Sequence, residues 1–72
     1  MSERELVLQR YYQKYNTMSN NLRNLPTYHF QDPVTMQSVI LSLTQVIQEI
    51  EANTALGQMI VQAEMSKIGR IR

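Results

Sequence analysis

Apolar side chains recur at alternating spacings of three and four residues along the first third of the chain. This spacing places them in one line along an α-helix, and such a line is buried when a second helix packs against it. Ser2 followed three residues later by Glu5 is a capping-box pattern, and Pro26 disfavours helical geometry at the residue before it. We therefore expect a helix over about residues 3–24. Its apolar line, the N-terminal seam, consists of Leu8, Tyr11, Tyr15, Met18, Leu22 and Leu25.

A second apolar pattern follows Asp32, which comes directly before Pro33. This pair is typical of a helix start, because the carboxylate caps free amides and proline lacks only an N–H that is not needed there. We expect a helix over about residues 33–68, joined to the first by a loop at about residues 25–32. A rival interpretation is a β-strand within residues 34–47, where β-branched residues are frequent, but strict alternation fails there. The apolar line of the second helix, the C-terminal seam, consists of Met36, Ile40, Leu43, Ile47 and Ile50.

Together the two patterns predict an all-α fold, in which residues 1–72 form a single domain. The domain is a two-helix antiparallel hairpin with a longer second helix. Its 72 residues are near the lower limit for a chain that folds alone, and the chain has no cysteine for a disulfide bond. We therefore expect oligomerisation or a partner chain to complete the fold.

The second helix is expected to be longer than the first and to extend beyond its end. If Leu25 lies near Met36, residues past about Ile60 extend beyond the first helix and have no partner within the hairpin. Residues 55–63 are apolar on more than one side, as in helices that are buried all round. The alternative is a break at Gly57 and a short third helix that folds back, although no turn-forming residue marks it. The expected partner interface consists of Leu56, Met59, Ile60, Val61, Met65, Lys67, Ile68, Arg70 and Ile71.

The charge balance excludes a strong electrostatic attraction to other molecules. The formal net charge is +1, which argues against nucleic acid or an anionic membrane as the partner. No stretch approaches the length of uninterrupted apolar residues that spans a membrane. The first residues lack the order of a cleavable signal peptide, so the chain is expected in the cytoplasm or exported without such a signal.

Residues that carry chemistry are few. His29 is the single histidine, and with no cysteine beside it we find no catalytic triad and no set of metal ligands. Glu49 and Glu51 are two residues apart, so they point to different sides of a helix and do not form an acid–base pair. Tyr28 and Phe30 alternate across His29, which fits either a short extended segment or a loop that covers the end of the hairpin. The sequence therefore indicates no enzyme, no cofactor and no metal.

One arrangement resembles a known family. Asp32-Pro33-Val34-Thr35-Met36 is similar to the opening of the second helix in the needle and inner-rod subunits of type III secretion systems. About forty residues follow, with Gln45 and Ile68 in comparable amphipathic surroundings, so the resemblance covers residues 32–72. The regular seam of the first helix, its paired tyrosines and the basic C-terminal residues depart from that family. A small helical-hairpin co-chaperone of the same secretion systems is also similar in size and seam.

Two classes of function remain open. The first is a non-enzymatic helix-packing assembly protein, which the resemblance implies is a structural subunit or chaperone of a type III secretion apparatus. Its partners would be further copies of this chain or another helical protein. The second is a small regulatory binding module, such as a phage protein, that docks on a protein or nucleic-acid partner. Association state separates them, because filaments or a fixed oligomer favour the first class.

Overall fold

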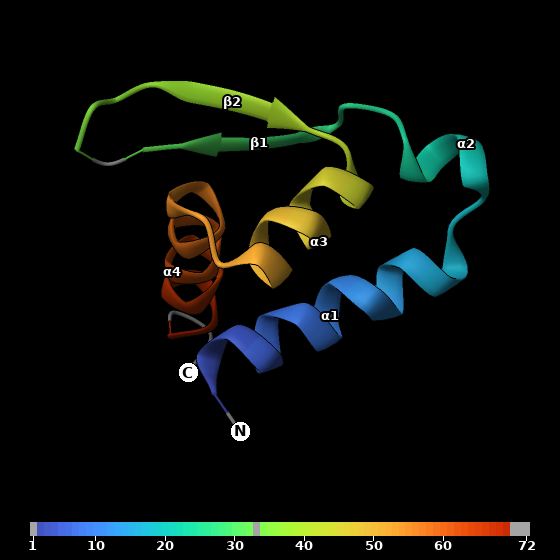
Figure 1. Cartoon of the computed structure of the whole chain (residues 1–72), viewed down its shortest axis with the longest axis horizontal. Helices are drawn as coiled ribbons and strands as arrows, with labels where there is room; N and C mark the ends of the chain where they lie inside the picture. Colours follow the sequence, from blue (N-terminus) through green and yellow to red (C-terminus); the bar gives the residue numbers. More distant parts are fainter. Residues whose placement is uncertain (1, 33, 70–72) are drawn as a thin grey trace.

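The computed structural model describes residues 2–32 and 34–69 (Figure 1). Their elements, in chain order, are α1 (Glu3–Thr17), α2 (Asn20–Arg23), β1 (Tyr28–Gln31), β2 (Ser38–Leu41), α3 (Leu43–Ala52) and α4 (Ala55–Gly69). The expectation of an all-α two-helix hairpin is therefore wrong. The chain combines helices with a small two-stranded antiparallel sheet.

Helix α1 starts at the expected residue, but it ends at Thr17 and not near the expected residue 24. The Ser2 hydroxyl accepts a hydrogen bond from the Glu5 amide at 3.2 Å, as a cap should. The helix stops at Thr17, and Ser19 caps the separate short helix α2. Serine and asparagine side chains compete for backbone hydrogen bonds, which explains why the first helix breaks in this part of the chain.

The segment around Asp32 forms a turn instead of starting a helix. One carboxylate oxygen of Asp32 accepts hydrogen bonds from the amides of Val34 at 2.8 Å and Thr35 at 3.4 Å. Met36 has a φ of 62°, a left-handed conformation that ends any helical continuation. The Asp32 amide then donates to the Gln37 carbonyl at 2.9 Å and closes a β-hairpin. The capping chemistry was recognised in the sequence, but it closes a turn.

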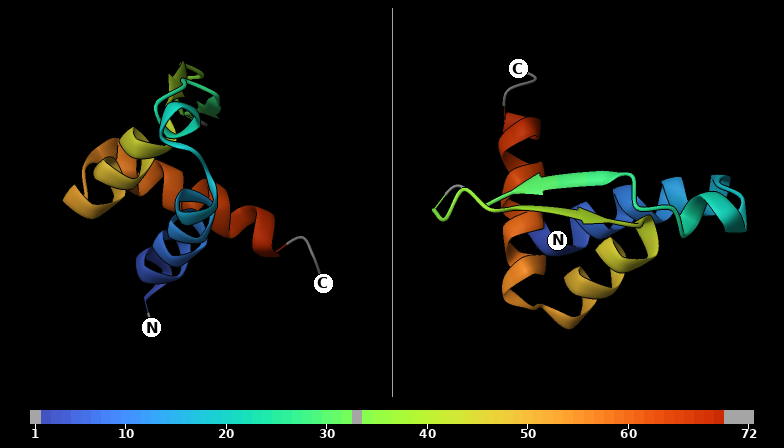
Figure 2. Two further views of the ribbon diagram at one scale, coloured as in Figure 1. Left: turned by 90° about the vertical axis from the view of Figure 1, so that its right-hand side faces the viewer. Right: turned by 90° about the horizontal axis from the view of Figure 1, so that it is seen from above.

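The hairpin lies over the helices (Figure 2), and the side chains of its inner face pack in or against the core. Alternate pairs point inward and outward, as the pleat of a strand requires. The inward pairs are Tyr28–Leu41 and Phe30–Val39, and the outward pairs are His29–Ile40 and Gln31–Ser38. The rival strand interpretation is thus correct for Ser38–Leu41, the strand β2.

Helix α3 begins ten residues later than the expected second helix, at Leu43. Ser42 and Gln45 form a reciprocal capping box there: the Ser42 hydroxyl accepts from the Gln45 amide at 3.2 Å and the Gln45 side chain accepts from the Ser42 amide at 3.1 Å. This serine–glutamine spacing is visible in the sequence and was missed. It is the signal that fixes where the helix starts.

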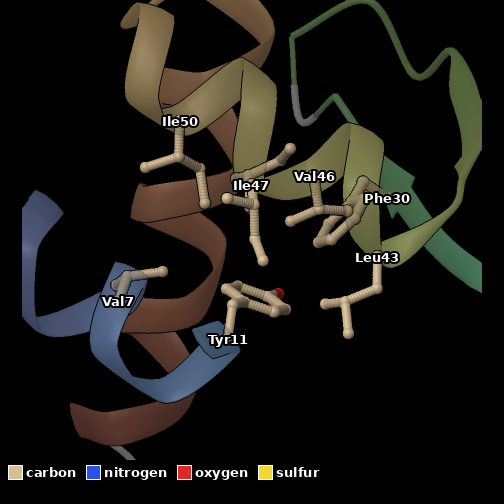
Figure 3. Close-up of a cluster of buried hydrophobic side chains, with 8 residues drawn as sticks. Val7, Tyr11, Phe30, Leu43, Val46, Ile47 and Ile50 are labelled. Carbon is tan, nitrogen blue, oxygen red and sulfur yellow. The ribbon is translucent and has the colours of Figure 1, made fainter. Parts of the chain in front are cut away.

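The core lies between α3 and the three elements around it (Figure 3). Side chains from α1, β1, α3 and α4 converge there. Helix α3 contributes half of the buried apolar residues, so it is the centre of the fold. The buried set is Val7, Tyr11, Phe30, Leu43, Val46, Ile47, Ile50 and Ile60.

The chain reverses after α3 so that α4 packs back on α1 and α3. Asn53 takes a left-handed conformation with φ 54°, and the Thr54 hydroxyl accepts from the Gly57 amide at 3.0 Å. The expected continuous helix over residues 33–68 is therefore wrong, and the alternative of a break with a helix that folds back is correct, except that the break lies at residues 53–54 and Gly57 is buried in the first turn of α4. A Cβ atom at this position would lie 2.1 Å from the carbonyl oxygen of Glu49. Glycine is thus required where α4 crosses the end of α3.

The two expected seams are only partly inside the molecule. Leu8, Tyr15 and Met18 are half-buried, and Tyr11, Leu43, Ile47 and Ile50 are buried. The four seam residues nearest the expected loop are exposed, because α2 and the hairpin replace the ends of the two long helices. These residues are Leu22, Leu25, Met36 and Ile40.

We expect Gly57→Ala to lower the free energy of unfolding by about 1–3 kcal/mol, because the added methyl group forces α4 away from Glu49. Helix propensity alone predicts the opposite sign, a gain of about 1 kcal/mol. Urea unfolding measures the difference, with Gln62→Ala on the exposed side of α4 as the control. A more stable Gly57→Ala protein would contradict the close crossing of the two helices.

We also expect Leu43→Ala and Leu22→Ala to differ strongly in stability. Leu43 is fully buried, so its truncation should cost about 2–5 kcal/mol, whereas Leu22 is 48% exposed and should cost about 1 kcal/mol or less. Thermal and urea unfolding of the two variants provide the measurement. Equal losses would instead support the continuous two-helix seam.

Candidate interaction surface

The partner interface expected at the end of the second helix lies largely within the fold. Ile60 is fully buried in the core. Leu56, Met59, Val61 and Met65 are half-buried and pack against it. Lys67 is exposed, and the side chain of Ile68 together with Arg70 and Ile71 lies outside the described residues. The described apolar side chains of α4 therefore pack within the same chain, where α4 contacts α1 and α3.

Exposed apolar side chains gather instead on the β-hairpin. Val34 is 87% exposed, Met36 64% and Ile40 53%, and we call these three residues the hairpin patch. Val34 and Met36 belong to the turn, and Ile40 lies on the outward face of β2. Leu22 and Leu25 are less exposed, at 48% and 46%, and lie at α2. The patch is unexpected from the sequence, because Met36 and Ile40 have the spacing of a buried helix face.

The hairpin is nearly free of charge. Residues 33–48 contain no charged side chain, and residues 24–66 contain no lysine or arginine. Asp32 is the single charged residue within 28–41, and its carboxylate is occupied by the amides of the turn. Such a surface fits another neutral or apolar protein surface better than a phosphate backbone or an anionic membrane.

A groove of about 780 Å³ runs beside the patch, between the hairpin turn and α4. Val34 belongs to both the groove and the patch. The opposite wall, on α4, presents small, amide and apolar side chains and one basic side chain. Its members are Ala55, Gln58, Met59, Gln62, Ala63, Ser66 and Lys67. The groove therefore adjoins the patch, and its charged lining residues are Asp32 on the hairpin side and Lys67 on α4.

A partly buried polar cluster joins α1 to α4. The Tyr11 hydroxyl donates a hydrogen bond to the Glu64 carboxylate at 2.8 Å, and the same oxygen lies 3.4 Å from the Lys67 ammonium group. Burial of the ring, followed by the hydrogen bond to Glu64, raises the pKa of Tyr11 above its ordinary value of 10.0. The tyrosine stays neutral and holds the two helices together.

Three basic side chains of α1 and α2 contact other groups of the fold. The Lys14 ammonium lies 5.5 Å from the ring centre of Tyr11, and the Arg23 guanidinium lies 4.1 Å from that of Tyr15. Arg4 donates to the carbonyl oxygen of Glu51 at 3.3 Å, at the end of α3. Cation–aromatic contacts and helix C-terminal contacts of this kind stabilise a small fold. They explain these basic residues without a nucleic-acid partner.

The candidate catalytic groups are dispersed or engaged. His29 is exposed and faces outward opposite Ile40, while Glu49 accepts a hydrogen bond of 2.6 Å from the Thr54 hydroxyl. Within residues 2–32 and 34–69, no three potential metal ligands lie close together. Among the described residues, we find no helix that combines the length and apolarity needed to cross a membrane.

No family model, curated protein or solved structure matches this chain. The resemblance to type III secretion needle subunits depends on a helix that opens at Asp32. The described part of residues 32–72 contains a strand and two helices in place of that single helix. The candidate interaction surface therefore rests on the geometry of the described residues alone.

We expect the Tyr11–Glu64 contact to affect stability at alkaline pH. A raised pKa in the folded state contributes stability that is complete below about pH 10 and is lost as the pH rises above that value. Tyr11→Phe should lower the free energy of unfolding by about 1.5–3 kcal/mol at neutral pH, because Glu64 loses a charge-assisted hydrogen bond. Its stability should then fall less than that of the parent between about pH 9 and pH 11.

Urea unfolding at a series of pH values measures both effects. Tyr12→Phe is the control, since the pKa of Tyr12 is also raised, by Glu51, but its side chain is 38% exposed. Parallel pH profiles for the parent and Tyr11→Phe would show that the contact does not stabilise the fold.

Proposed function

We propose that this chain is a non-enzymatic binding module that associates with another protein chain through its β-hairpin. The observation that carries the proposal is the hairpin patch. Val34, Met36 and Ile40 place three large apolar side chains in water on one short element. Apolar side chains concentrated on one element in this way are characteristic of an interaction site.

The charge distribution supports a protein partner. The hairpin has no basic side chain, and the basic residues Lys14 and Arg23 lie on aromatic rings of the helical part. A protein surface with an apolar centre and a polar rim complements the hairpin patch and the amide-rich groove wall. Association through the hairpin replaces the helix-to-helix docking expected from the sequence.

We do not extend the proposal to a secretion apparatus. That role was implied by a long helix over residues 33–68, and β2 lies within that segment. The hairpin patch supports a more general role, in which the helices form a compact support and the hairpin presents the binding surface. This organisation is that of a small regulatory or assembly module.

We expect Val34→Ser to weaken association while leaving the fold intact. The Val34 side chain is 87% exposed, so the free energy of unfolding should change by about 0.5 kcal/mol or less. Association is measured by photo-cross-linking in the host cells, with a photo-reactive amino acid placed at Met36. The matched control position is Gln13, which is exposed on α1.

Protein adducts from position 36 that disappear when Val34 is also changed to serine would support the proposal. Adducts from position 13 alone, or none from either position in protein that is shown to be folded, would contradict it. Circular dichroism and urea unfolding of each variant establish that the fold is retained.

A further inference from the structure

The sheet has two backbone edges, and no other strand of the described residues covers either of them. In Figure 1, β1 lies between β2 and the helices, and the left panel of Figure 2 shows the hairpin above the helical layer. The edge of β2 is therefore the one that faces away from the rest of the molecule. An unpaired strand edge is a template for another strand.

The turn identifies which backbone groups of β2 face this edge. The Asp32 amide donates to the Gln37 carbonyl, so residues 32 and 37 bond toward each other. Hydrogen-bonded pairs alternate along an antiparallel ladder, which makes Phe30–Val39 the next such pair. The amides and carbonyls of Ser38 and Ile40 must then point away from β1, to the free edge.

This edge carries no charged side chain, proline or bulge that would protect it. Ser38–Leu41 contains no proline, no lysine and no other charge, and its partners follow β1 in an unbroken register without a bulge. Natural proteins use those features to prevent edge-to-edge pairing. Ile40 adds a large apolar side chain that is 53% exposed. The short length of four residues limits the strength of pairing but does not prevent it.

We propose that β2 pairs with β2 of a second copy of this chain and forms a four-stranded antiparallel sheet. The twofold axis passes at Val39, so that Ser38 lies opposite Ile40 of the second copy. Each copy supplies two amides and two carbonyls, which gives four backbone hydrogen bonds across the axis. Val39 then faces Val39 of the second copy in a pair without hydrogen bonds.

The geometry and the charge of the free edge of β2 both allow it to pair with β2 of a second copy. The twofold pairing keeps the inward residues Val39 and Leu41 of both copies on the same face of the sheet. Both copies contribute an uncharged surface, because residues 33–48 carry no charge, so no like charges oppose each other. The small contact area predicts a weak dimer that forms as the protein concentration rises.

This inference rests on the proposed function and names the partner at the same hairpin. Because the chain has no cysteine, a single introduced cysteine can form a disulfide only with another copy. The Cα atoms of a pair without hydrogen bonds lie about 4.5 Å apart, which suits a disulfide. We therefore expect Val39→Cys to form a covalent dimer on mild oxidation.

The matched control is Ile40→Cys. Ile40 is more exposed than the half-buried Val39, so random collisions would cross-link position 40 faster. In the proposed pairing, position 40 lies diagonally across the axis from its counterpart, at about 7–8 Å, beyond the reach of an unstrained disulfide. We expect Val39→Cys to cross-link at least about tenfold faster than Ile40→Cys.

Amide hydrogen exchange tests the unmodified protein. The amides of Ser38 and Ile40 should become protected as the concentration rises, whereas those of His29 and Gln31, on the outer edge of β1, should continue to exchange. Faster cross-linking at position 40, or exchange at Ser38 and Ile40 that does not change with concentration, would overturn the pairing. Adducts with a different protein from position 36 would in that case leave the proposed function standing with another partner.

Discussion

The burial of α3 is the constraint on which the rest of the structure depends. A chain of 72 residues can exclude water from only one small cluster, and here that cluster surrounds a ten-residue helix. Ile50 meets Val7 of α1 and the region of α4 where Gly57 allows close approach, while Leu43 and Val46 lie toward Phe30 of the hairpin (Figure 3). Each outer element contributes one or two buried side chains, and all of them pack around α3.

Local signals in the sequence were more reliable than the long-range pattern. Ser2 starts a helix as its spacing with Glu5 indicates, and Asp32 binds amides as a capping aspartate does. The same Asp32 contact is compatible with a helix or a turn, however, and the sequence alone did not decide between them. The capping box of Ser42 and Gln45 was the missing evidence, since a second start signal implies that the first segment had ended.

The apolar spacing misled at the hairpin for a specific reason. Met36 and Ile40 are four residues apart and fit a helix face, yet Val39 and Leu41 are two apart and fit the inner face of a strand. A segment this short satisfies both periods. At α4 the sequence pattern was a better guide than at the hairpin. Residues 55–63 are apolar on more than one side, and α4 does have neighbouring helices on more than one side. The neighbours are α1 and α3 of the same chain, which the assumption of a simple hairpin had placed out of reach.

The contacts of the charged side chains differ between the helical part and the hairpin. On the helical part, Lys14 and Arg23 contact aromatic rings, Arg4 contacts the end of α3, and Lys67 bridges to Glu64. These contacts stabilise a core too small to be stable through apolar burial alone. The hairpin receives one such contact on its inner side, where the Lys14 ammonium lies 5.8 Å from the ring centre of Tyr28, whereas its outward face carries apolar and neutral side chains. Burial of a surface of that kind against another surface is favourable, which is why we propose the hairpin as the site of association.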